Sequence, residues 1–172
     1  GVLRMWFVSG GSEQDANDKP TIRRQYLGYA ESRDGFSWEI HPEPIYPSGR
    51  GPCILTGEGG GYTMWMNSAP DPDGEFASLA ANIFRFTSDD GIEWARDPEP
   101  VVTAGGPARS NVYPFVINDS GDYTMWYACA VEGGYCELYC STSSDGVEWT
   151  HHRDHASFPA TRNPDDFDGR YT

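Results

Sequence analysis

Positive charge is scarce in this sequence of 172 residues. It has 12 Lys and Arg against 26 Asp and Glu, so its formal net charge is -14 at pH 7. This balance would repel both a nucleic-acid backbone and an anionic bilayer surface. We therefore expect neither nucleic acid nor membrane among the partners.

Long apolar runs and paired cysteines are lacking as well. No stretch approaches the roughly 20 apolar residues of a membrane-spanning helix. The four cysteines form no CxxC pair, which argues against a structural zinc site. We expect free, buried thiols, with a Cys129–Cys136 disulfide across a predicted hairpin as the open alternative.

Two groups of catalytic motif are also missing. The sequence contains no glycine-rich phosphate loop at a strand-to-helix turn and no G-x-S-x-G string. Phosphoryl transfer and serine hydrolysis therefore have no support, and we expect no cofactor.

Aromatic residues, glycine and proline are plentiful. Aromatics make up 14% of the chain, with 20 Gly and 13 Pro. The aromatics can form a core, which argues against a disordered chain. The glycines and prolines indicate many turns and exclude a mostly helical protein.

Internal repeats are the strongest signal in the sequence. The string Ser-x-Asp-Gly-x-x-Trp occurs three times, ending at Trp38, Trp94 and Trp149. A Met-Trp segment precedes each copy, at residues 3–7, 62–66 and 123–127. A Pro-led apolar segment occurs twice, starting at Pro52 and Pro114.

Each repeat predicts a four-stranded antiparallel sheet. Asp-Gly between two strand-like runs is typical of a hairpin turn. The Met-Trp segments are apolar on both alternating faces, which predicts a sheet covered on both sides. Sheets stacked in this way form the blades of a β-propeller. We therefore assign the repeated aspartates and tryptophans to turns and blade packing before any chemistry.

The predicted fold is all-β, a partial β-propeller of three blades in one repeat domain. Blade 1 covers about 1–42 and lacks its innermost strand, blade 2 covers about 50–97, and blade 3 covers about 111–152. Residues 153–172 form a tail. The prediction is three, four and four strands.

These strands, in this order, resemble the five-bladed propeller glycosidases, a group that includes arabinanases, invertases, levansucrases and mannoside phosphorylases. The resemblance rests on residues 27–35, on residues 123–127 and on the two Pro-led strands. In those enzymes, catalytic carboxylates lie at the central ends of the innermost strands. The matching segments here, residues 49–52 and 110–114, contain no acid. Glycosyl transfer needs a pair of acids, so the resemblance implies an incomplete catalytic set.

The resemblance places a carbohydrate site in an axial pocket lined by loops. Arg and Asn can bind sugar hydroxyls, and Tyr offers a flat face. The predicted substrate-binding residues are Arg50, Glu75, Arg109, Ser110, Asn111, Tyr113 and Tyr135. The remaining candidates for a dispersed catalytic pair are Glu132 and Asp168.

Two other polar clusters could suggest a metal. Residues 71–75 are rich in oxygen ligands but lack the spacing of a calcium loop. His151, His152 and His155 have no second ligand cluster, and a polar linker explains them. We expect no metal site.

The function predicted from the sequence is a glycosidase-like scaffold that binds carbohydrate without a complete carboxylate set. The alternatives are a non-enzymatic interaction module, or a partial glycoside hydrolase or phosphorylase that needs partner blades. Because three blades expose apolar faces, we also expect a homodimer that completes a six-bladed ring, with residues 165–172 near the partner's first blade.

Overall fold

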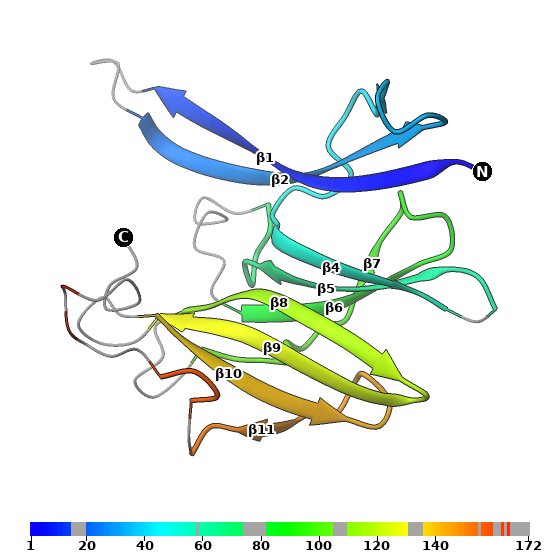
Figure 1. Ribbon diagram of the computed structural model, residues 1–172. Helices are drawn as coiled ribbons and strands as arrows, with labels where there is room; N and C mark the ends of the chain where they lie inside the picture. The colour runs from blue at the N-terminus through cyan, green and yellow to red at the C-terminus, as the bar shows by residue number, and fades with distance from the viewer. Residues whose placement is uncertain are drawn as a thin grey trace.

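All regular structure in the described part of the protein is β. The computed structural model describes residues 1–14, 20–57, 59–73, 82–104, 110–130, 136–154, 156–159, 163 and 165. Within these ranges it contains eleven strands in three antiparallel sheets (Figure 1). No helix in them is long and apolar enough to cross a bilayer.

The sheets contain three, four and four strands, as the repeats predict. Blade 1 is formed by β1 (Leu3–Gln14), β2 (Pro20–Ser32) and β3 (Glu39–Ile40). Blade 2 is formed by β4 (Arg50–Thr56), β5 (Tyr62–Ser68), β6 (Asn82–Ser88) and β7 (Ala95–Arg96). Blade 3 is formed by β8 (Ser110–Asp119), β9 (Asp122–Ala130), β10 (Cys136–Ser143) and β11 (Thr150–His152).

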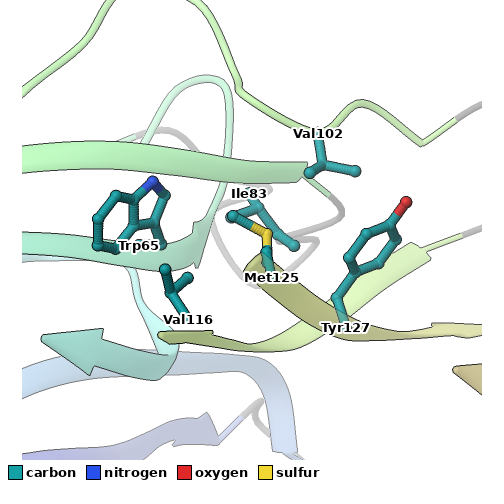
Figure 2. Close-up of a cluster of buried hydrophobic side chains, with 6 residues drawn as sticks. All are labelled: Trp65, Ile83, Val102, Val116, Met125 and Tyr127. Carbon is teal, nitrogen blue, oxygen red and sulfur yellow. The ribbon is translucent and has the colours of Figure 1, made fainter. Parts of the chain in front are cut away.

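The core lies between successive blades. Blades 1 and 2 share a cluster around Leu27, Met64 and Phe86. Blades 2 and 3 share a second cluster, in which Trp65 and Ile83 of one sheet face Val116, Met125 and Tyr127 of the next (Figure 2). Blade 2 has both faces covered, which explains why its Met-Trp strand, β5, lacks the usual alternation of polar and apolar residues.

A short bridge, absent from the sequence prediction, recurs after each outermost strand. After its outermost strand, each blade returns to the strand next to that one and adds a single β-bridge. The bridges pair Tyr46 with Leu27 of β2, Val102 with Ile83 of β6, and Phe158 with Leu138 of β10. Phe158 lies in the segment predicted to be a tail. Part of that segment therefore belongs to the repeat.

The Ser-x-Asp-Gly turns are built from side-chain to backbone hydrogen bonds. In blade 2, Ser88 Oγ accepts from the amide of Gly91 at 2.8 Å. Asp90 Oδ1 accepts from the amides of Ile92 and Glu93 at 2.8 and 2.9 Å. These amide donors lower the pKa of the Asp90 carboxyl, and equivalent bonds lower those of the other two turn aspartates, Asp34 and Asp145.

The Met-Trp tryptophans join each blade to the next. Trp6 Nε1 donates to the carbonyl of Gly91 at 2.7 Å, and Trp65 Nε1 donates to that of Gly146 at 3.2 Å. Each glycine leaves room for the indole, because a Cβ at Gly91 would lie 2.8 Å from Trp6 Cζ2. The same contact therefore fixes both blade junctions at the Asp-Gly turn.

Candidate functional site at the loop end of the blades

The innermost strands of blades 2 and 3 begin with the same backbone irregularity. The register shifts between Arg50 and Cys53 in β4 and between Val112 and Phe115 in β8. Each shift contains a residue before proline with positive φ, Gly51 at 60° and Tyr113 at 55°. We call this end of the blades the loop end and the opposite end, with the Asp-Gly turns, the turn end.

Tyr113 is a strained residue. Glycine adopts positive φ freely, whereas a residue with a Cβ in this region costs roughly 1–2 kcal/mol. Tyr113 is 50% exposed. Such strain is found mostly at functional sites. The ring also reaches the neighbouring strand, because a Cβ on Gly51 would lie 2.8 Å from Tyr113 Cδ1.

Arg50 lies next to this contact and is half-buried. Its Nε donates to Oε1 of Gln25, on β2 of blade 1, at 2.6 Å. Because the guanidinium group has five N–H donors, this bond leaves capacity for a ligand. The Arg50 side chain therefore reaches toward blade 1, whereas the Tyr113 ring contacts Gly51, the next residue of β4.

Two fully buried asparagines connect the blades beneath Tyr113. Asn67 Oδ1 accepts from the amide of Tyr113 at 2.9 Å, and Asn67 Nδ2 donates to the carbonyl of Asn111. Asn111 Oδ1 accepts from Cys129 Sγ at 3.3 Å. The bond to the Tyr113 amide holds the strained residue in place.

Two buried polar atoms nearby, Asn111 Nδ2 and the Tyr127 hydroxyl, have no hydrogen-bond partner among the described residues. A buried polar group without a partner costs about 1–3 kcal/mol.

The Tyr127 ring stacks on that of Tyr139, whose hydroxyl donates to Glu137 at 2.9 Å. Burial and this bond raise the pKa of Tyr139 to about 12.

All four cysteines are free. Cys129 aligns with Glu137, and Cys136 aligns with Ala130. Aligned residues share a face and neighbours along a strand alternate, so the two thiols lie on opposite faces of the sheet. This geometry rules out the alternative disulfide. Burial raises the pKa of Cys129 to about 11, so the thiol stays protonated.

Of the residues predicted to bind substrate, the structure brings Arg50, Asn111 and Tyr113 to the loop end. Arg50 and Tyr113 are accessible, while Asn111 is buried between blades. Ser110 begins β8, and its side chain lies outside the described part of the structure. The other predicted site residues lie outside the described residues: Glu75, Arg109, Glu132, Tyr135 and Asp168.

His151 and His152 form side-chain hydrogen bonds across the strands, from β11 to β10. His151 Nδ1 is 2.8 Å from Ser141 Oγ, and His152 Nε2 is 3.0 Å from Thr142 Oγ1. The two rings lie on alternate faces of β11, and His155 is outside the described residues. Within the described part of the chain, no three metal-ligating side chains form a group.

Two surface hollows lie at the turn end. One of about 660 Å³ is bounded by Asp89, Asp90 and Trp94 of blade 2. The other, of about 440 Å³, is bounded by Asp34 and Trp38 of blade 1. Because both hollows lie beside the same repeated turn, they are features of the repeat.

The sequence reasoning missed Gln25, Asn67 and Cys129 as parts of the loop end. Asn67 had a usable signal, because it follows the Met-Trp segment where the other two repeats carry Val8 and Ala128. A polar residue where the other repeats carry an apolar one indicates that the blades differ at this position.

No protein-family profile matches the chain. "Uncharacterized protein Rv1502" of Mycobacterium tuberculosis strain H37Rv is 35% identical over 94 residues, which are 54% of this chain and 30% of that protein. A counterpart from strain CDC 1551, MT1551, matches to the same extent. The chain spans about a third of the length of these relatives.

Solved structures give broader coverage at low identity. The Bombyx mori GH32 β-fructofuranosidase BmSUC1 aligns with a TM-score of 0.65 and 10% identity, covering 88% of this chain and 34% of that one. A structure titled for the GH130 mannoside phosphorylases, with glycoside hydrolases that target β-1,2 mannosidic linkages in Candida mannan, aligns at 0.62 and 17%, covering 93% and 49%. The family 117 glycoside hydrolase Zg3597 of Zobellia galactanivorans aligns at 0.54 and 19%, covering 73% and 43%.

These structures are propeller enzymes of the kind that the sequence resembles. At such identities the likeness concerns fold, and fold alone does not determine function. The chain therefore has the fold of part of a β-propeller.

Proposed function

We propose that this part of the propeller binds a neutral carbohydrate at the loop end. The observation that carries the proposal is Tyr113, a strained and exposed aromatic residue at the same end of the blades as Arg50. An aromatic face packs against the apolar face of a sugar ring, and a guanidinium group binds its hydroxyl oxygens.

Within this proposal, the described loop end binds sugar without cleaving it. Cleavage of a glycosidic bond needs two carboxyl groups on either side of that bond. The starts of β4 and β8 present glycine, arginine, asparagine and tyrosine instead. Glu132 and Asp168 remain the predicted acids if a dispersed pair operates.

Calorimetric titration with soluble fragments of arabinan, fructan and mannan tests the proposal. We expect one of these fragments to bind, Tyr113→Ala to weaken its binding at least about tenfold, and Arg50→Ala to weaken it by a similar factor. Tyr113→Ala keeps the Cβ at positive φ, so it isolates the ring. Arg33→Ala, in an exposed turn, is the matched charge control and should bind like the wild type. Background heats with all three fragments would contradict the proposal.

Aryl glycosides test the absence of cleavage separately. We expect no turnover. Turnover that is abolished by Glu132→Gln or Asp168→Asn would reveal a dispersed acid pair and a partial glycoside hydrolase.

A second candidate, a non-enzymatic interaction module, is favoured by the bonds between blades. Gln25 pairs with Arg50, and Asn67 pairs with Asn111, so these polar groups contribute to blade stacking. In that case the loop-end variants would change stability while no glycan binds.

A further inference from the structure

Two non-glycine residues in the described part of the chain have a positive φ, and a turn explains only one of them. Ser120 (φ 57°) and Gly121 form the two-residue turn between β8 and β9, and a type I′ hairpin turn requires positive φ at both positions. Tyr113 (φ 55°) lies within β8 and precedes Pro114, where an extended backbone with negative φ is the norm. The sequence of β8 therefore does not by itself account for the conformation of Tyr113.

Support for this conformation comes from the neighbouring blade. The register shift between Val112 and Phe115 leaves Tyr113 without an aligned residue in β9. Asn67 of β5 bonds to it instead, because its Oδ1 accepts from the Tyr113 amide at 2.9 Å while its Nδ2 donates to the carbonyl of Asn111. One side chain of blade 2 therefore bonds the blade 3 backbone on both sides of Val112.

These two bonds account for an asparagine at this position. Asn67 is fully buried, and a buried amide is costly unless it is hydrogen-bonded. The equivalent residues of the other repeats are Val8 and Ala128, so a blade forms without a polar residue there. Asn67 also aligns with Arg50 of β4. It is therefore adjacent to both residues that we propose to bind sugar.

We propose that Asn67 is a positioning residue for carbohydrate binding at the loop end. Its bonds to the Tyr113 amide and the Asn111 carbonyl favour the positive-φ backbone that presents the Tyr113 ring to the sugar. A backbone relaxed to negative φ would point the Cβ of residue 113 in another direction and displace the ring. The inference rests on the proposed function, because the position of the ring affects binding only if a sugar binds there.

The size of the effect follows from the fraction of molecules that have the competent backbone. The positive-φ cost of a residue with a Cβ corresponds to a factor of roughly 5–30 in population. Without the bonds from Asn67, the competent fraction should fall by about that factor, and the apparent affinity should fall with it.

Calorimetric titration of the full chain with the best-binding fragment of arabinan, fructan or mannan tests the proposal. Asn67→Ala and Asn67→Val introduce the residue types of the other two repeats, and both should bind about 5–30-fold more weakly than the wild type. Asn82→Ala is the matched control and should bind like the wild type, because Asn82 Oδ1 also accepts from a backbone amide, that of Ala104 at 2.9 Å. Urea unfolding of each variant verifies that the proteins compared are folded.

A double-mutant cycle with Tyr113→Ala shows whether Asn67 acts through the ring. If it does, Asn67→Ala should have little effect once the ring is gone, so the double variant should bind like Tyr113→Ala. Two factors that simply multiply would mean that Asn67 acts elsewhere, and would overturn the proposal.

A crystal structure of Asn67→Ala gives a readout that does not depend on the ligand. We expect the φ of Tyr113 to become negative. A positive φ that persists without Asn67, or unchanged affinity in both Asn67 variants while the wild type binds, would overturn this proposal alone. Absence of binding by the wild type would overturn the proposed function and this inference with it.

Discussion

The repeats carry the same residues at one end of the blades and different residues at the other end. At the turn end, three copies of Ser-x-Asp-Gly-x-x-Trp form the same hydrogen bonds, with glycine φ values of 78°, 84° and 74°. At the loop end, equivalent positions carry different residues, as Gly51 and Tyr113 do. Residues that are identical between the repeats therefore form the scaffold, while residues that differ make the ends of the individual blades distinct.

Removal of Trp65 should produce the largest effect, because the turn end depends on it. Trp65 is 1% exposed and spans a blade junction. We expect Trp65→Ala to reduce the free energy of unfolding by about 3–5 kcal/mol, as measured by urea denaturation. Trp65→Phe keeps a ring and should cost less. A cost of Trp65→Ala below about 1 kcal/mol would show that the repeated tryptophans do not hold the blades together.

Alanine at the turn glycines sharpens the comparison within a single motif. Gly91→Ala places a Cβ 2.8 Å from the Trp6 ring, whereas Gly35→Ala meets only Leu3 at 3.4 Å. Both variants incur the positive-φ strain of roughly 1–2 kcal/mol. We expect Gly91→Ala to cost about 1–3 kcal/mol more, because the indole must move. Equal costs in urea denaturation would contradict the assigned blade junction.

Tyr113→Gly tests whether the strained backbone at Tyr113 lowers stability while its side chain contributes to glycan binding. Glycine relieves the positive φ, so we expect unfolding to require about 1 kcal/mol more while glycan binding is lost. Gly51→Ala, at the equivalent position of β4, should destabilise the protein because its Cβ meets Tyr113. If Tyr113→Gly is destabilising and binds normally, Tyr113 is a packing residue.

Acid sensitivity should be the smallest effect. Because turn amides lower the pKa of Asp90, the folded state favours its carboxylate. This contribution is present above the ordinary pKa of about 4 and is lost as the pH falls through the lower folded-state value. Asp90→Asn should therefore reduce the loss of urea stability between about pH 6 and pH 3. Asp89→Asn is the matched control, and a similar change there would show that net charge alone is responsible.

The fold was readable from the sequence because each blade repeats its own signals. The spacing of the tryptophans predicted three sheets with three, four and four strands, and the structure has them. The loop end was less readable. The Asn67–Asn111 bond depends on how two sheets stack, and no pattern within one strand contains that information. The strained φ of Tyr113 depends on a bulge that lacks the glycine found at Gly51.

Hydrogen exchange in the presence of glycan tests the central claim most directly, that the loop end binds while the turn end is scaffold. The tightest-binding fragment of arabinan, fructan or mannan is titrated into the full chain, and backbone amide exchange is followed by residue. We predict slower exchange around residues 49–53 and 110–115, with residues 33–38, 89–94 and 144–149 unchanged. Protection confined to the three turns would contradict the account and would place the ligand on the repeated end.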